Sequence, residues 1–175
     1  MNEQIKKLIT PNNKDFTALS NEMIEFIDSF GSVIISSDLG EHCVASYAPF
    51  VREEDEIYII ISQIAKHYKS IKDFPNKVQI IFLQDEISSS SIFARKRASF
   101  RVEAKFIQNK ADYIGKFESK FADEVPFLIV KQMGDFHIVR LKLCKGCFVK
   151  GFGAAFEIDG LKVIKQIGEG MPHKI

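Results

Sequence analysis

The stretch of this sequence with the clearest capacity for chemistry is 88–102, where four consecutive serines lead into Arg95, Arg97 and Arg101. In a β-strand these arginines would all face one way, and the alternate positions, such as Phe100, would face the other. Guanidinium groups bind phosphate or carboxylate through two parallel hydrogen bonds. The pattern therefore predicts a strand with one face in the core and one basic face. On the pattern alone, the basic face is as consistent with an anion-binding site as with a solvent-exposed surface.

The overall composition describes one soluble globular domain. The 175 residues are 46% hydrophobic and 27% charged, and the formal net charge is +1. A chain so near neutrality is not expected to bind nucleic acids or membrane surfaces in general. The longest apolar runs, 57–61 and 125–130, are too short to span a bilayer, and the start of the chain lacks the apolar core of a secretory signal. The predicted location is the cytoplasm.

The cysteines predict neither a disulfide framework nor a metal site. There are three, Cys43, Cys144 and Cys147, and an odd number in a chain without a signal peptide does not favour disulfides. The last two have C-x-x-C spacing, but no second pair accompanies them, and they lie between strand-like runs rather than at the start of a helix. We therefore expect a turn at Lys145–Gly146 with no redox role.

The histidines show no metal-binding spacing, but two of them are candidates for a ligand site. His67 lies in a short helical pattern and could line a cleft. His173 lies in a tail that contains glycine and proline, and this tail could fold over a pocket and place an imidazole there. On the sequence pattern alone, a histidine so near a terminus more often has no such role.

The periodicity of hydrophobic residues predicts a mainly β protein with peripheral helices. Helices are expected at 15–29, 64–72 and 111–122, and the segment 125–133 is ambiguous between helix and strand. The expected strands are 32–37, 43–48, 56–61, 78–83, the arginine-bearing segment, 136–143 and 148–158. Because the elements show no βαβ alternation, an antiparallel barrel is the predicted architecture. The predicted organisation is an N-terminal extension over 1–14, a barrel domain over 15–167 and a C-terminal tail over 168–175.

Four segments of the sequence, in order, resemble one known family. They are Ser46-Tyr-Ala-Pro-Phe50, Tyr58-Ile-Ile-Ile-Ser-Gln-Ile-Ala-Lys-His-Tyr68, Ile92-Phe-Ala-Arg-Lys-Arg97 and Gly151-Phe-Gly-Ala-Ala-Phe156. Together they resemble the HugZ-type haem-utilisation proteins of the FMN-binding split-barrel superfamily, to which the pyridoxamine-phosphate oxidases also belong. The resemblance implies a six-stranded antiparallel split barrel that forms a homodimer with ligand sites at the subunit interface.

The same resemblance implies haem binding and oxidative opening of the porphyrin ring, which would release iron for the cell. It implies that His173 is the ligand of the haem iron and that an arginine of the Ala-Arg-Lys-Arg strand reaches the haem. Arg95 is the first choice for the catalytic role of stabilising negative charge beside the iron, and Arg97 is the second. Arg97 or Lys96 would pair with a propionate. An external electron donor is expected because the chain shows no reductase domain.

Ser91 and His67 complete the predicted set of ligand-contacting residues, and two alternative functions use the same set. In the first, the serine run and the arginines would hold the phosphate of FMN in an oxidoreductase of the pyridoxamine-phosphate oxidase type. In the second, the protein would carry or store haem without degrading it.

Overall fold

The structure is a computed structural model, and it describes residues 16–168. Its elements in chain order are α2 (Phe16–Asp28), β1 (Ser32–Asp38), β2 (Cys43–Glu53), β3 (Glu56–Ser62), α3 (Lys66–Asp73), β4 (Val78–Leu83), the 3₁₀-helix η1 (Ile92–Ala94), β5 (Arg97–Phe106), α4 (Ala111–Phe121), α5 (Val125–Val130), β6 (Phe136–Gly151), β7 (Ala154–Asp159) and β8 (Lys162–Gln166).

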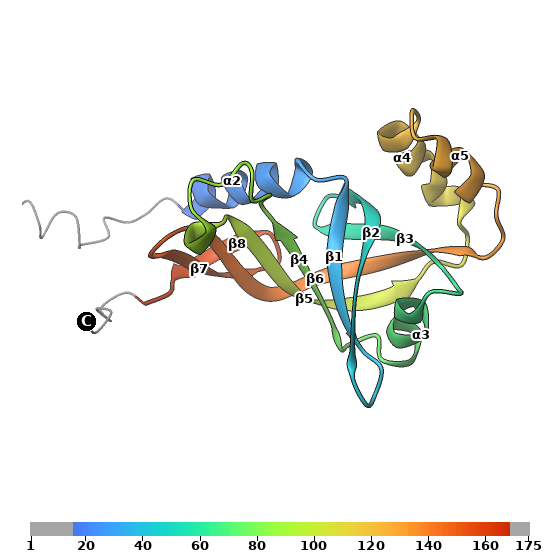
Figure 1. Ribbon diagram of the computed structural model, residues 1–175, viewed down its shortest axis with the longest axis horizontal. Helices are drawn as coiled ribbons and strands as arrows, with labels where there is room; N and C mark the ends of the chain where they lie inside the picture. Colours follow the sequence, from blue (N-terminus) through green and yellow to red (C-terminus); the bar gives the residue numbers. More distant parts are fainter. Residues whose placement is uncertain (1–15, 169–175) are drawn as a thin grey trace, which may run out of the picture.

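Six antiparallel strands close into a barrel in the order β3-β2-β1-β4-β5-β6, and pairing of β3 with β6 completes the circle. The long strand β6 makes this possible, because its first half pairs with β3 and its second half continues past the barrel to pair with β7. Strands β7 and β8 therefore extend the sheet at one end of the molecule (Figure 1). The predicted six-stranded barrel with peripheral helices is confirmed, with two strands added.

Alternating burial along the strands creates the core. On β5, the residues Ala98, Phe100 and Val102 are buried, while the residues between them face outward. The chain has no tryptophan, and phenylalanines fill much of the core. The rings of Phe50 and Phe82, for example, pack edge to face with 5.1 Å between their centroids.

Helix α2 lies along one side of the barrel beside β8 (Figure 1). Its apolar face packs on the barrel, and Met23 and Ile27 on this face are fully buried. Ser20 Oγ accepts a hydrogen bond from the backbone N–H of Val163 at 2.9 Å. The helix thereby fixes the strand pair that extends beyond the barrel.

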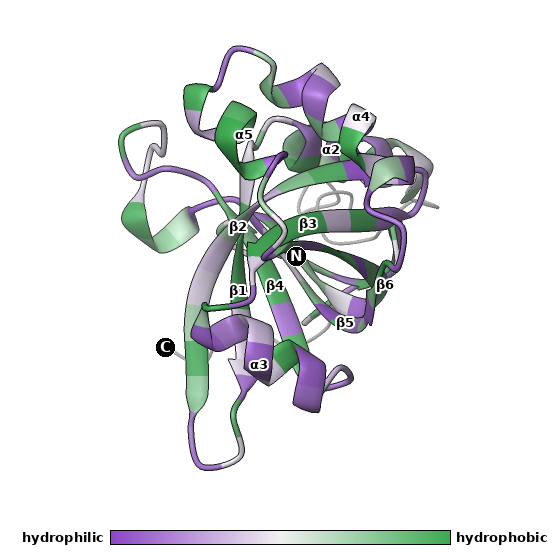
Figure 2. Ribbon diagram, turned by 90° about the vertical axis from the view of Figure 1, so that its right-hand side faces the viewer, coloured by the Kyte–Doolittle hydropathy of each residue, from purple (hydrophilic) through white to green (hydrophobic). Residues whose placement is uncertain are grey.

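Helices α4 and α5 form a second, smaller cluster against the outside of β3 and β6. Phe117 is fully buried, and the ring of Tyr113 stacks on that of Tyr58 at 4.7 Å. Figure 2 shows that α5 is hydrophobic along most of its length, whereas α3 at the other side of the barrel is largely hydrophilic. The segment that was ambiguous from the sequence is therefore helical over Val125–Val130.

The predicted break at Lys145–Gly146 is wrong. Strand β6 runs without interruption through both residues, and the chain turns instead at Phe152–Gly153, where Gly153 has a φ of +71°. Strand β8 was not predicted from the sequence. The predicted extension 1–14 and nearly all of the tail 168–175 lie outside the described residues. Within 16–168, no helix is long and apolar enough to cross a membrane.

Candidate functional site

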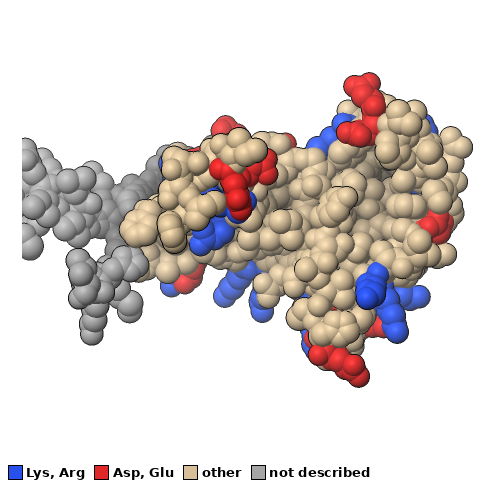
Figure 3. Space-filling view, in the orientation of Figure 1, with Lys and Arg blue, Asp and Glu red and all other residues tan. Residues whose placement is uncertain are grey.

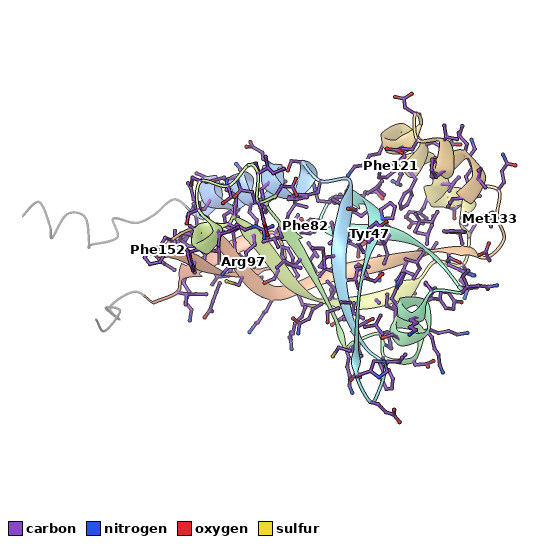
Figure 4. The ribbon with its side chains drawn as sticks, viewed as in Figure 1. Tyr47, Phe82, Arg97, Phe121, Met133 and Phe152 are labelled. Atoms are coloured by element: carbon purple, nitrogen blue, oxygen red, sulfur yellow. The ribbon has the colours of Figure 1, made fainter. Side chains whose placement is uncertain are left out.

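A cavity of about 650 Å³ lies where β7 and β8 join the end of β6. This volume falls within the range of about 300–1,000 Å³ that is usual for small-molecule sites. The lining residues come from η1, β5, the β6–β7 turn and the end of β8: Phe93, Arg97, Val149, Gly151, Phe152, Gly153, Ala155, Gln166, Ile167 and Gly168. Figure 4 shows Arg97 and Phe152 together at this end of the molecule.

Arg97 is the only charged residue among the described residues that line the cavity. It is the first residue of β5, and the alternation that buries Ala98 in the core turns Arg97 outward to the cavity. Its Nη1 atom donates a hydrogen bond of 3.3 Å to the carbonyl oxygen of Arg95, which leaves other guanidinium N–H groups to meet an anion.

Arg95 does not belong to the strand, so the predicted stripe begins at Arg97. The side chain of Arg95 turns toward the preceding loop, where Nε donates to the carbonyl oxygen of Gln84 at 2.8 Å and Nη1 pairs with Glu86 at 3.1 Å. The structure therefore places Arg95 as a support of the loop between β4 and η1. Its predicted catalytic role stays a prediction.

Lys96 points away from the cavity, toward α2. Its Nζ atom lies 2.9 Å from one carboxylate oxygen of Glu22, and Lys150 Nζ lies 2.6 Å from the other. Burial alone would raise the pKa of Glu22, but the hydrogen bonds from the two lysines outweigh it and hold the pKa below its usual value. Charged groups of both signs meet beside α2 and η1 in Figure 3.

The serine run is used for local turns in this structure. Ser91 is the N-cap of η1 and accepts a hydrogen bond from the backbone N–H of Phe93 at 3.3 Å. Ser88 and Ser89 donate to backbone carbonyl groups within the same loop. Direct contact of Ser91 with a ligand stays a prediction, and its structural role is to position Phe93 at the cavity.

The structure describes one of the two candidate histidines, His67. His67 lies on α3, at the opposite end of the molecule from the cavity (Figure 1), and within one protomer it is therefore separated from Arg97. Its imidazole is buried, its Nε2 atom finds no hydrogen-bond partner in the described part of the chain, and burial lowers its pKa. His173 lies outside the described residues, but Gly168, the last described residue, lines the cavity.

Phe93 and Phe152 line the cavity, and the sequence analysis did not select them. Phe152 stands between two glycines, and Phe93 comes two residues after a run of four serines, so both are large apolar residues beside segments that predict turns. This mismatch between residue type and local context is the signal that could have identified them.

The described residues offer no alternative metal centre. No cluster of three or more histidine, cysteine or acidic side chains within 16–168 is placed to hold a metal ion. Cys144 and Cys147 lie within strand β6, and burial raises the pKa of the Cys147 thiol although the charge of Arg97 opposes this.

The closed six-stranded barrel and the cavity at its extended edge define a split-barrel protein. The chain is 34% identical over 119 residues to "Heme oxygenase HutZ" of Vibrio cholerae, and the match covers 66% of each protein. The structure of Campylobacter jejuni ChuZ is 36% identical with a TM-score of 0.85, over 93% of this chain and 68% of ChuZ. This chain therefore belongs to the HugZ/HutZ-type family of split-barrel proteins.

Further structures agree on the fold. The solved structure of Vibrio cholerae HutZ, which is named as that of a haem storage protein, matches with a TM-score of 0.67 and 28% identity. The match covers 74% of this chain and 93% of the HutZ chain. A protein from Listeria innocua named for pyridoxamine 5′-phosphate oxidase matches with a TM-score of 0.58 and 11% identity, over 75% of this chain and 98% of that one. At that identity the likeness concerns the fold alone. No protein-family model matches the chain. The matches span about two thirds of the full lengths of ChuZ and of the curated HutZ.

Proposed function

We propose that this protein binds haem and opens its porphyrin ring oxidatively, releasing the iron. The observation that carries the proposal is the cavity of about 650 Å³, in which one arginine stands among mainly apolar lining residues. Haem presents a wide apolar plane and two carboxylates at one edge, so it matches this combination. The family relationship to a protein named as a haem oxygenase supports the same choice.

Arg97 would pair with a propionate of haem and thereby fix the orientation of the ring. A guanidinium group remains charged at any physiological pH and can donate two parallel hydrogen bonds to a carboxylate. Arg95 is proposed as the residue that stabilises negative charge developing beside the iron, which would require its side chain to leave Gln84 and Glu86.

His173 is the proposed iron ligand. It follows Gly168 by five residues, and a chain of five residues spans at most about 18 Å. Because Gly168 lines the cavity, an imidazole on this tail is within reach of a ligand held there. Neutral imidazole is a common axial ligand of haem iron.

Bound haem would supply the oxygen chemistry itself, and the protein would supply orientation and charge. Dioxygen is the proposed oxidant, and a reductant from outside this chain would provide the electrons. A homodimer with the ligand at the subunit interface, a cytoplasmic location and the division into extension, barrel and tail are parts of the same proposal.

Haem storage without degradation is the second candidate, and one observation favours it: the solved HutZ structure is described as that of a haem storage protein. Storage and degradation would use the same cavity and the same iron ligand. The two functions differ only in what happens when electrons and dioxygen are supplied.

Binding of FMN is less well supported by the described residues. A phosphate dianion is best held by several free cations and hydroxyl groups. Lys96 and Lys150 are paired with Glu22, and the hydroxyl groups of Ser88 and Ser89 donate to carbonyl oxygens within their own loop. Purified protein that is yellow and releases free flavin on denaturation would reverse this preference.

Anaerobic titration with haem tests the binding site. Wild type should give a Soret band characteristic of a histidine-ligated haem, and His173→Ala should lose or shift that band. His42→Ala is the matched control, because His42 is an exposed histidine in the hairpin between β1 and β2. An unchanged spectrum in His173→Ala would refute the assignment of the iron ligand.

Addition of ascorbate or a reductase under air tests the activity. Loss of the Soret band with release of chelatable iron is expected for the oxygenase. A Soret band that persists under both reductants would remove the claim of turnover and leave storage.

A further inference from the structure

Two large aromatic side chains are exposed at the cavity. The exposed fraction is 86% for Phe93 and 80% for Phe152, although most phenylalanines of the chain are wholly or partly buried. A single exposed apolar residue needs no explanation, but these two come from separate elements, η1 and the β6–β7 turn, and line the same cavity. The two side chains together present exposed apolar area at the cavity.

The backbone of Gly151 adds a second, independent observation. Gly151 lines the cavity, its φ lies outside the left-handed region, and a Cβ atom built on it would meet nothing within 4 Å. Neither backbone strain nor packing against residues 16–168 therefore requires glycine at this position. The absence of a side chain leaves bare backbone facing the space of the cavity.

We propose that Phe93, Phe152 and the backbone of Gly151 form a flat apolar slot that holds the plane of a porphyrin, with Arg97 meeting a carboxylate at its edge. This inference rests on the proposed function and names the residues that recognise the macrocycle independently of its iron. Aromatic rings stack on planar π-systems, and a phenylalanine has few rotatable bonds to immobilise on binding. A glycine beneath such a plane allows it to lie directly on the backbone.

Metal-free protoporphyrin IX is the probe that separates this slot from the iron ligand. Its binding, followed by fluorescence, should be about tenfold weaker in Phe93→Ala and in Phe152→Ala, because each variant loses one buried aromatic contact. Gly151→Val should also weaken binding, since its side chain would occupy the slot. His173→Ala should weaken the binding of haem by a larger factor than the binding of protoporphyrin IX, because only haem carries the iron that an imidazole can ligate.

Ile64→Ala is the matched control. Ile64 is 87% exposed and lies two residues before α3, and Figure 1 shows α3 at the other end of the molecule, so the substitution removes a comparable exposed apolar side chain away from the cavity. Phe152→Leu should bind with intermediate affinity, because it keeps apolar bulk but lacks a ring. Thermal unfolding of each variant checks that the fold is intact.

This experiment distinguishes failure of the proposed function from failure of the aromatic slot. Wild-type protein that binds neither haem nor protoporphyrin IX would overturn the proposed function. Wild-type protein that binds both, together with Phe93→Ala and Phe152→Ala variants of wild-type affinity, would overturn the slot alone.

Discussion

Gly146 on β6 packs so closely against Ser99 on β5 that a Cβ atom at Gly146 would overlap the carbonyl oxygen of Ser99. The contact lies beside a register shift between Phe100 and Val102, where the long strand adjusts its pairing with β5. Because β6 continues past this point to pair with β7, the contact also positions the turn that carries Phe152.

We predict that Gly146→Ala lowers the free energy of unfolding by about 1–3 kcal/mol, because the strands must separate to admit the methyl group. Urea denaturation would measure this. Gly115→Ala is the control: Gly115 lies inside helix α4 with open space around it, so alanine should stabilise the protein by about 0.5–1 kcal/mol. Equal stability of Gly146→Ala and wild type would contradict the close packing.

The pairing of Glu22 with Lys96 and Lys150 should stabilise α2 on the barrel. We expect Glu22→Gln to lower the free energy of unfolding by about 1 kcal/mol, since it leaves two lysines without their acidic partner. Glu25→Gln removes the same charge from an exposed site on the same helix and should have little effect.

The pH dependence of this difference follows from the lowered pKa of Glu22. The unfolded chain takes up the proton at a higher pH than the folded protein does, so the stabilisation is fully present above the ordinary value near 4.5 and is lost as the pH falls through the folded pKa. The gap between wild type and Glu22→Gln should narrow below pH 4.5. A constant gap would argue against the ion pairs as its cause.

His67 should make the protein less stable in mild acid. Burial lowers its pKa below the ordinary 6.5, so as the pH falls past 6.5 the unfolded chain binds a proton that the folded protein does not. Stability is therefore expected to decrease below that pH, and His67→Gln should flatten the decrease. Identical profiles for wild type and His67→Gln would disprove the assignment.

Arg97 should contribute to haem affinity through a propionate. Arg97→Gln is expected to weaken haem binding about tenfold, whereas Arg101→Gln, on the exposed part of the same strand and away from the cavity, should bind normally. Haem dimethyl ester lacks the negative charges, so wild type and Arg97→Gln should bind the ester equally. A persistent difference with the ester would mean that Arg97 acts by another route.

Local sequence pattern was sufficient for much of the barrel. The alternation around Ala98 and Phe100 correctly separated the core face of β5 from its outward face, because side-chain direction in a strand follows from backbone geometry alone. The hydrophobic periodicity likewise predicted a helix at 15–29, and the structure has α2 at Phe16–Asp28. The family resemblance then identified the barrel type, which ChuZ and HutZ confirm.

The same local reasoning failed where distant segments meet. Gly146 resembled a turn residue, yet glycine is required there because β5 approaches it closely, and a contact across the sheet leaves no trace in neighbouring residues. Arg95 fitted the strand pattern, but Gln84 and Glu86 offer its guanidinium group partners just outside the strand.

The sequence by itself determined most of the strands, the inward face of β5, the family and the set of candidate basic residues, because each depends on short-range periodicity or on contiguous motifs. Only the tertiary structure decided which of those candidates share a site. It joined Arg97 to Phe93, Phe152 and the end of β8, turned Lys96 toward α2 and placed His67 on a distant helix. The physical reason is that strand pairing and helix docking bring these residues together over long sequence separations, and a local pattern cannot encode which strands will pair.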